Sequence, residues 1–524
     1  MSLTTRFPKI PKEEVTPIVA QLLEIVQIQI EEIQLLKDEI ARLKNQKPRP
    51  KIRPSSLESP FKRGKTKKRT KRSKKSKTKK IEIHEFVSIP PKNVPAGSKL
   101  KDYQEYVVQD LIIGNWNTCY RRQRWQTPKG DYILGKLPKH VTGSHFGTTL
   151  TSFVLYQYHG CHVTQPLIKE QLHELGVNIS TGQINNIIIK NKDRFHDEKD
   201  QILTTGLKVS NYINVDDTGA RHKGQNGYCT HIGNEYFAWF KSTGRKSRIN
   251  FLNLLRCEHT DFVLNDPALE YMAHQKLPGY QLSKLSCYKY KVFKNETRWI
   301  NFLKRQKIKV ERHKRIATEG AFVGSITYHG FNPELAIISD DAGQFKVFLH
   351  GLCWVHAERT IQKIIGFNDH QNQLLDEVKT DIWQLYRDLK KYRCNPDVAQ
   401  KHALKDRFNR VFTRKTGFAT LDLALKRIHR NRSELLLVLQ RPDIPLHNNL
   451  SENDIREYVK KRKISGSTRS DMGQECRDTF TSLKKTCRKL GISFWQYLKD
   501  RVAHQNRYPP LAVIMKSQML QPGG

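Results

Sequence analysis

Three acidic residues in three separate settings constrain this chain more than any other feature. Asp216 follows the strand-like run 212–215, Asp340 follows the apolar run 335–338 after one serine, and Glu452 lies in a stretch of helical character. Short apolar runs of this kind are typical of buried strands, so both aspartates are predicted at strand ends. If the two strands are neighbours, about 4.8 Å apart, their carboxylates can share a hard cation. A lone acidic residue at a strand end is more often a turn former or a helix cap.

The order of the surrounding elements places the two aspartates in a common setting. Strands are predicted at 212–215, 227–230 and 236–240, forming a three-strand meander with turn residues at 232–235. A helical pattern begins at Lys246 and precedes the second aspartate-bearing strand, and the helix with the glutamate comes last. This succession is the order of the α/β ribonuclease H-like fold, a mixed sheet flanked by helices, whose carboxylates bind Mg²⁺ for phosphodiester chemistry.

Separate motifs spread over roughly residues 140 to 500 point to a known family. They are VDDTGAR at 215–221, SDDAGQF at 339–345, CWVHAER at 353–359 and NNLSE at 448–452. With these motifs the chain resembles the insertion sequence 66 family of transposases, which belong to the DDE class of bacterial transposases.

The resemblance implies that Asp216, Asp340 and Glu452 are the catalytic triad and bind two Mg²⁺ ions per active site, with Mn²⁺ as a substitute. Asp217 and Asp341 stay open as alternatives because each directly follows one of the two aspartates. Asp216 is preferred because the family has Asp-Glu-Thr where this chain has Asp-Asp-Thr. Asp340 is preferred because the family's aspartate follows a serine.

Other residues of these motifs are predicted to support the site or to contact DNA. His356 and Asn449 are assigned to support, although a histidine in such a setting is about as often a packed core residue. The family usually has arginine where this chain has Asn453, which removes one cation beside the site. Phosphate contacts are predicted for the cations that follow the glutamate, with a solvated helix face as the alternative. These cations are Arg456, Lys460, Lys461, Arg462 and Lys463.

The charge of the chain indicates a polyanionic partner. The formal net charge is +41 over 524 residues, and nucleic acid is the commonest partner of such a chain. Residues 62–80 contain 13 Lys and Arg and no acid, which leaves +28 on the rest (41 minus 13). This run, within a predicted disordered linker at 49–96, is expected to make nonspecific phosphate contacts. A solubilising tail or a nuclear targeting signal are the alternatives.

The first 48 residues show a heptad pattern over four heptads. β-branched residues at one core position and mainly leucine at the other predict a parallel two-stranded coiled coil, with Gln29 as a polar interruption that can fix the register. The alternative is an amphipathic helix that packs on its own domain. Family members resemble this chain in carrying a zipper here, so a homodimer or a higher oligomer is expected. The predicted dimerisation residues are Leu22, Val26, Ile33, Leu36, Ile40 and Leu43.

Two modules are predicted before the catalytic core. Residues 97–142 form a small β-rich module, with strand-like segments at 107–113 and 132–134, where many family members carry a zinc-binding cysteine cluster. No zinc is expected here because the nine cysteines contain no C-x-x-C pair. Residues 143–200 are predicted to be helical, with helices at 153–157 and 166–175 and with Ser180 capping a third helix through residue 189. This region can be a helix-turn-helix or plain scaffold.

The catalytic domain is predicted at 201–256 and 327–470, with an insertion at 257–326 and a C-terminal helical region at 471–524. The insertion is basic and carries interleaved aromatic residues at 289–314, so we expect it to contact DNA; a surface insertion without such a role is the alternative. Its aromatic residues are Tyr290, Phe293, Trp299 and Phe302.

These features predict a DNA transposase that binds the ends of an insertion sequence and catalyses metal-dependent strand cleavage and strand transfer. Its partners would be the terminal repeats, target DNA and its own copies, and could include accessory proteins of the element. The alternatives are a catalytically silent DNA-binding regulator and a nonspecific nuclease. No run of 18 apolar residues and no signal-peptide core are found, so a cytoplasmic, nucleoid-associated protein without membrane contact is expected.

Overall fold

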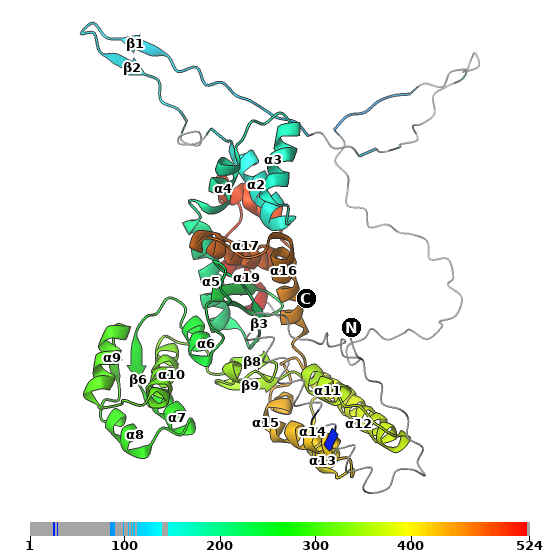
Figure 1. Cartoon of the computed structure of the whole chain (residues 1–524). Helices are drawn as coiled ribbons and strands as arrows, with labels where there is room; N and C mark the ends of the chain where they lie inside the picture. Colours follow the sequence, from blue (N-terminus) through cyan, green and yellow to red (C-terminus); the bar gives the residue numbers. More distant parts are fainter. Residues whose placement is uncertain are drawn as a thin grey trace.

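A computed structural model describes residues 84–89, 113–138 and 145–520, together with a few single positions. These single positions are 25, 26, 29, 98, 103, 106, 108 and 109. The predicted coiled coil and the basic run therefore lie almost entirely outside the described residues. The structure is built around one mixed sheet in the middle of the chain, with helices on both faces and helical lobes at its sides (Figure 1).

The central sheet has five strands in the order β5-β4-β3-β8-β9. The strands are β3 (Tyr212–Gly219), β4 (Tyr228–Gly233), β5 (Ala238–Thr243), β8 (Ala336–Ser339) and β9 (Leu349–Leu352). The first three form the predicted antiparallel meander, while β8 runs parallel to β3 and β9 runs parallel to β8. This order is compatible with a ribonuclease H-like core.

Two details of the sheet differ from the sequence prediction. Ile232 and Gly233 belong to β4, and the turn lies one step later, where the Asn234 amide donates to the Phe237 carbonyl over 3.0 Å. Strand β9 was not predicted in the sequence analysis, because its LHGL sequence contains a histidine and a glycine. Gly351 is needed there because a Cβ atom would lie 2.9 Å from Ile338 Cδ1 on β8.

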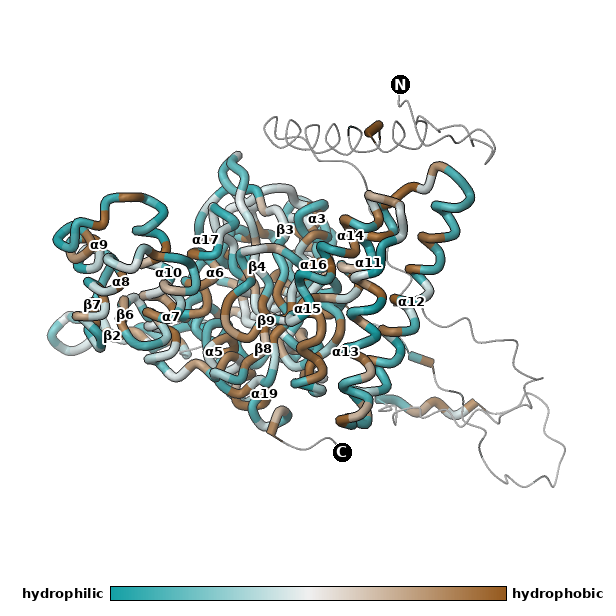
Figure 2. Tube along the Cα trace, turned by 90° about the horizontal axis from the view of Figure 1, so that it is seen from below, coloured by the Kyte–Doolittle hydropathy of each residue, from teal (hydrophilic) through white to brown (hydrophobic). Residues whose placement is uncertain are grey.

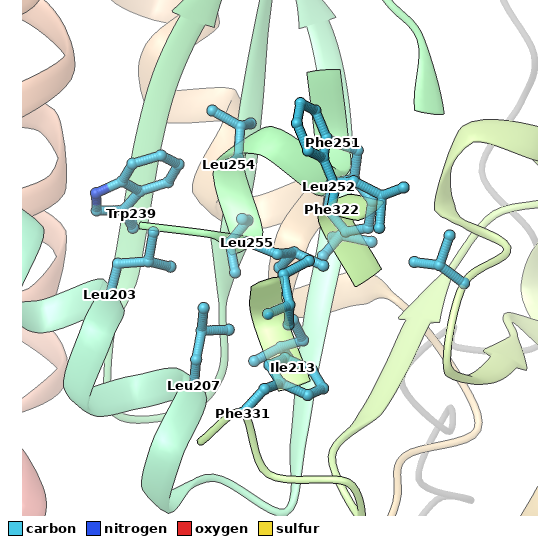
Figure 3. Packing of buried hydrophobic residues seen from close by; sticks show 14 of the residues in the cluster. Leu203, Leu207, Ile213, Trp239, Phe251, Leu252, Leu254, Leu255, Phe322 and Phe331 are labelled. Carbon is cyan, nitrogen blue, oxygen red and sulfur yellow. The ribbon is translucent and has the colours of Figure 1, made fainter. Parts of the chain in front are cut away.

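One face of the sheet packs on an apolar core formed with α5 (Asp193–Val209) and α6 (Arg248–Leu255). Figure 3 shows Leu203 and Leu207 of α5 facing Ile213 of the sheet and the leucines of α6. Odd-numbered residues of β3 point into this core. Because side chains alternate along a strand, even-numbered residues such as Asp216 point to the opposite face.

Of the four C-terminal helices, α16 (Asn449–Ser465) covers the opposite face of the sheet and α17 (Asp471–Lys489) covers one edge. Helices α18 (Phe494–Val502) and α19 (Leu511–Leu520) pack against α2 and α5. Helix α17 covers the edge strand β5, where the Phe240 amide donates to Ser482 Oγ over 2.9 Å and the Ser242 amide donates to Asp478 Oδ2 over 2.6 Å. The side chains of α17 thus satisfy backbone groups that would otherwise be free to pair with another chain.

An inserted lobe stands between α6 and β8, beside the sheet (Figure 1). Its elements are β6 (Phe262–Leu264), α7 (Asp266–His274), α8 (Gly279–Ser286), β7 (Lys291–Phe293), α9 (Glu296–Arg305) and α10 (Glu311–Tyr328). Phe293, Trp299 and Phe302 are buried in its core, where Trp299 stacks on Phe262. These three aromatic residues are therefore not available to DNA, whereas Tyr290 is exposed, and contact of the lobe with DNA stays a prediction.

A second helical lobe follows β9. It was included in the catalytic domain in the sequence analysis and was not predicted as a separate lobe. It contains α11 (Trp354–Gln362), α12 (Asp369–Cys394), α13 (Val398–Thr413), α14 (Ala419–Arg430) and the short α15 (Arg432–Leu435). Its buried hydrophobic residues form one cluster, and Figure 2 shows hydrophobic and hydrophilic positions alternating along α12. Trp354 packs edge-on against Phe408, which joins α11 to α13.

The helical module before the sheet consists of three helices around a small core. They are α2 (Thr148–Leu155), continued by the π-helical turn η3 (Tyr156–Gly160), α3 (Gln165–Glu174) and α4 (Thr181–Ile189). The first helix starts five residues before the predicted position. The predicted cap is confirmed: Ser180 Oγ accepts from the Gln183 amide over 3.2 Å, and Gln183 Oε1 accepts from the Ser180 amide over 2.8 Å.

We expect Ser180→Ala to destabilise α4 by about 1 kcal/mol, because two amides at the helix start lose their reciprocal partners. Amide hydrogen exchange over residues 181–189 should become about fivefold faster. Ser180→Thr keeps a hydroxyl acceptor and serves as the control. Equal acceleration in both variants would show that the cap does not hold this helix.

The remaining described strands form an exposed hairpin, β1 (Arg124–Gln126) and β2 (Tyr132–Leu134). The second strand confirms the prediction at 132–134. In the predicted strand at 107–113, the described residues 108, 109 and 113 are not in a strand. Among the helices of the described residues, none is both long enough and apolar enough to cross a membrane.

Candidate active site

The two predicted aspartates lie at the same level of neighbouring parallel strands. The last partners of the β3–β8 pair are Asn214 and Ile338; Asp216 lies two residues further along β3, and Asp340 lies two residues after Ile338, just beyond the end of β8. The two carboxylates are close enough for the charge of Asp340 to raise the pKa of Asp216. The expectation that the two strands adjoin is therefore confirmed. Asp340 follows Ser339, the last residue of β8, so both carboxylates emerge where β8 ends.

The geometry separates Asp216 from Asp217. Asp216 is the cross-strand partner of His231, and such partners share a face of the sheet. The His231 ring lies 2.5 Å from Ser451 Oγ, so this face is the one that α16 covers. Asp217 points the other way, where its carboxylate accepts from Thr230 Oγ1 over 2.5 Å and lies 4.0 Å from Lys246 Nζ. Only Asp216 faces the helix that carries the glutamate.

The contacts of Asp340 and Asp341 distinguish these two adjacent aspartates. Asp341 lies 3.1 Å from Lys346 Nζ and 3.3 Å from Arg427 Nη2. Burial raises the pKa of Asp341, but the hydrogen bonds and charges of these two cations outweigh it and lower the pKa below its usual value. Asp340 accepts a hydrogen bond from the Ala342 amide over 3.1 Å and forms no ion pair with a cation of the described residues. Its negative charge therefore acts on Asp216.

Asp216 carries the electrostatic signature of a crowded acidic site. Burial raises its pKa to about 7, and the negative charge of Asp340 is the second cause. Asp217 and Glu452 also raise this pKa, whereas the Asp217 amide lowers it by donating to Asp216 Oδ1 over 2.8 Å. A buried carboxyl next to further carboxylates is strained in its charged form, and a cation would relieve this strain.

Glu452 lies in the first turn of α16, beside an arginine and a histidine of α11. Its Oε1 atom is 3.3 Å from Arg359 Nη1 and 3.7 Å from His356 Nε2. Burial and the charge of Arg359 lower the pKa of His356. His356 thus lies near Glu452, and its supporting role stays a prediction; Arg359, from the same motif, was not singled out in the sequence analysis. Within the described residues no three His, Cys, Asp or Glu side chains are arranged as ligands of one metal ion.

Asn448 ties the start of α16 to the strand that carries Asp216. Its Nδ2 atom donates to the Val215 carbonyl over 2.8 Å, and its Oδ1 atom accepts from Asn214 Nδ2 over 2.8 Å. Its amide donates to Cys353 Sγ over 3.2 Å, which adds the start of α11 to the same junction. The side chain is fully buried. The sequence prediction had assigned support to the neighbouring Asn449, whose side chain makes no hydrogen bond within the part of the chain that the structure describes.

A buried ionic network lies behind this junction and was not predicted. Asp454 of α16 lies 3.1 Å from His231 Nε2, 3.0 Å from Lys485 Nζ and 2.7 Å from Lys489 Nζ. Burial raises the pKa of Asp454, but the hydrogen bond from His231 and the two lysines lower it far below its usual value. The network connects β4, α16 and α17, and it fixes the helix one turn beyond Ser451 and Glu452.

The predicted phosphate contacts divide into exposed and internal cations. Arg456, Lys460 and Lys463 are exposed on α16, so their DNA contacts stay a prediction. Lys461 is 3% exposed, donates to the Tyr158 carbonyl over 2.7 Å and lies over the Tyr158 ring. Its assignment to DNA is wrong because this side chain joins α16 to the helical module. Arg462 is half-buried and donates to Thr218 Oγ1 and to the Gly219 carbonyl of β3.

Comparison with known proteins identifies the family. The family model described as "Transposase IS66 family" matches residues 327–476, a range that includes Asp340, the CWVHAER motif and Glu452. The chain is 42% identical over 320 residues to an uncharacterized protein, y4jO, from Sinorhizobium fredii (strain NBRC 101917 / NGR234). That alignment covers 60% of this chain and all of the relative. The resemblance seen in the motifs is thereby confirmed: the chain belongs to the IS66 family of transposases.

Proposed function

We propose that this transposase cuts and joins DNA at the ends of an insertion sequence with Asp216, Asp340 and Glu452 as its catalytic carboxylates. The main support is the placement of Asp216 beside Asp340 on parallel strands, on the face that α16 covers. The effect of both Asp340 and Glu452 on the pKa of Asp216 gives electrostatic support for a common site.

The three carboxylates are oxygen donors of the kind that divalent cations prefer, and they would have to draw together around the ions, because the described side chains are not arranged around one metal position. Mg²⁺ takes carboxylate oxygens and uses few protein ligands, and Mn²⁺ accepts the same donors. The raised pKa of Asp216 indicates uncompensated negative charge at the place where such ions would bind. When bound, two such ions would activate the attacking water and stabilise the leaving 3′ oxygen. Asp216, Asp340 and Glu452 would hold them.

The residues around the triad have two further roles in this proposal. Arg359 and His356 of α11 lie beside the Glu452 carboxylate and would keep it near the site before the ions bind. The exposed cations Arg456, Lys460 and Lys463 of α16 would contact DNA phosphates near the scissile bond. Phosphate contacts of this kind position the duplex and do not read its sequence.

The test uses the full-length protein and a labelled duplex that carries the ends of the element. With Mg²⁺ or Mn²⁺ we expect nicking at the 3′ ends of the element and joining of these ends to a target plasmid, and with EDTA we expect neither. Binding of the ends without cleavage, in the presence of the element's accessory proteins, would favour a DNA-binding regulator. Cleavage of unrelated DNA without joining would favour a nuclease.

Asn448→Ala is expected to lower strand cleavage about 10- to 100-fold while end binding stays unchanged. The substitution removes the hydrogen bonds that set α16 against β3, and partners of this kind typically affect a metal site by that factor. Cleavage rates at increasing Mg²⁺ measure the effect, and a thermal unfolding curve shows whether the fold is kept. Asn449→Ala is the control from the adjacent position. A larger loss in the control than in Asn448→Ala would contradict this role of Asn448.

A further inference from the structure

We infer that α4 is the sequence-reading helix of a helix-turn-helix and that Asn186 contacts an adenine in the major groove of the element's terminal duplex. The inference rests on the proposed function only in the identity of the DNA. Figure 1 shows α3 and α4 at the end of the molecule beyond α16 and α17, where the long second helical lobe does not reach.

The connection between α3 and α4 is fixed at both ends by hydrogen bonds. Gly176 has φ of +77°, a left-handed conformation suited to glycine, and its amide donates to the His173 carbonyl over 2.9 Å. The Val177 amide donates to the Leu172 carbonyl over 2.8 Å, which completes a Schellman motif. The capping box at Ser180 then starts α4. Two helices joined by a rigid turn with glycine are compatible with a helix-turn-helix as well as with plain scaffold, and the exposed face of α4 decides between them here.

The two faces of α4 differ sharply in character. Ile184 and Ile188 are fully buried in a core shared with α2 and α3. Gln183, Asn186 and Lys190 are exposed and follow each other at three and four residues, so they form one stripe on the outer face. The helix contains no acidic residue, and a duplex could therefore approach it without charge repulsion.

Asn186 is the side chain best placed to read a base. Its amide is exposed and makes no hydrogen bond to any residue that the structure describes, so a donor and an acceptor are both available. An asparagine amide pairs with adenine by donating to N7 and accepting from N6. The Gln183 Oε1 atom is already used in the cap, which leaves its NH₂ group for a single contact. Lys190, at the end of the helix, suits a phosphate.

The experiment measures specificity in EDTA, where no strand is cut. Fluorescence anisotropy gives the affinity of the full-length protein for the end duplex and for a scrambled duplex of equal composition. The ratio of the two affinities should fall about 10- to 100-fold in Asn186→Ala, while the affinity for the scrambled duplex stays the same. The control is Asn372→Ala, an exposed asparagine on α12 of the second helical lobe, and it should keep the wild-type ratio.

A second arm identifies the base. Replacing each adenine of the end duplex by 7-deaza-adenine removes the N7 acceptor at one position at a time. One such change should weaken binding of the wild type and have no effect on Asn186→Ala. An unchanged specificity ratio in Asn186→Ala would overturn the inference, as would a wild type without preference for the ends. If the ratio falls as expected but the wild type never cuts with metal, the inference stands and the proposed catalysis fails.

Discussion

Asp216→Asn, Asp340→Asn and Glu452→Gln are each expected to lower strand cleavage and strand transfer by on the order of 10³-fold. Each change removes a charged oxygen donor from the site. Metal ions contribute several kcal/mol to such a reaction, and about 1.4 kcal/mol corresponds to a factor of ten in rate. Binding of the end duplex in EDTA should stay unchanged. The substituted side chains belong to the proposed metal site, whereas the phosphate contacts are assigned to the exposed basic side chains of α16.

The controls are the neighbouring acids that the sequence could not distinguish from the pair. Asp217→Asn leaves a group that can still accept from Thr230 on the other face of the sheet, and Asp341→Asn affects a pair with Lys346 and Arg427. Both should retain most of the cleavage rate. A loss in Asp217→Asn as large as that in Asp216→Asn would show that the face assignment of the first aspartate is wrong.

Arg501→Met should destabilise the protein by about 3–5 kcal/mol, because it leaves the buried carboxylates of Glu198 and Asp500 without their cation. The Glu198 carboxylate accepts from Arg501 Nε and Nη2 over 2.9 Å each, from Tyr497 Oη over 2.8 Å and from the Leu511 amide over 2.9 Å. Both charged side chains are almost fully buried. The pair fastens α18 and α19 to α5, so urea unfolding of the full-length protein should begin at a clearly lower concentration.

Two variants show whether the buried charge is the cause. Lys379→Met breaks a half-exposed pair with Asp376 on α12 and should cost less than about 1 kcal/mol. The double change Glu198→Gln with Arg501→Met removes both charges and should recover part of the lost stability. If the double variant is as unstable as Arg501→Met alone, lost packing of the arginine accounts for the effect instead.

Local patterns in the sequence were sufficient for the elements that carry the acids. The runs before Asp216 and Asp340 contain the residues of buried strands, and the turn chemistry between 227 and 240 predicted the meander within a few positions. The cap at Ser180 was also readable, because its two partners are three residues apart in sequence. Such features depend on neighbours along the chain, and those are what a sequence displays.

Features that depend on distant partners were not predictable. Asn448 and Lys461 resemble any polar residue near a helix, and their burial follows from contacts with Val215 and Tyr158, far away in sequence. The choice between Asp216 and Asp217 likewise needed the register with His231 on β4. The sequence around Phe293, Trp299 and Phe302 looks the same whether these residues contact DNA or form a core, and only the fold shows that they are buried.

The contacts between the helical module and α16 fix the distance between α4 and the carboxylates. Lys461 binds the carbonyl of Tyr158, and Lys484 of α17 binds the carbonyl of Gly160 over 2.6 Å, so the π-helical turn η3 is fastened to the helix of Glu452 and to its neighbour. A base read by α4 and a phosphate at the carboxylates would then lie a set number of base pairs apart. The cleavage position, and with it the boundary of the mobile element, would lie at a fixed number of base pairs from the recognised sequence.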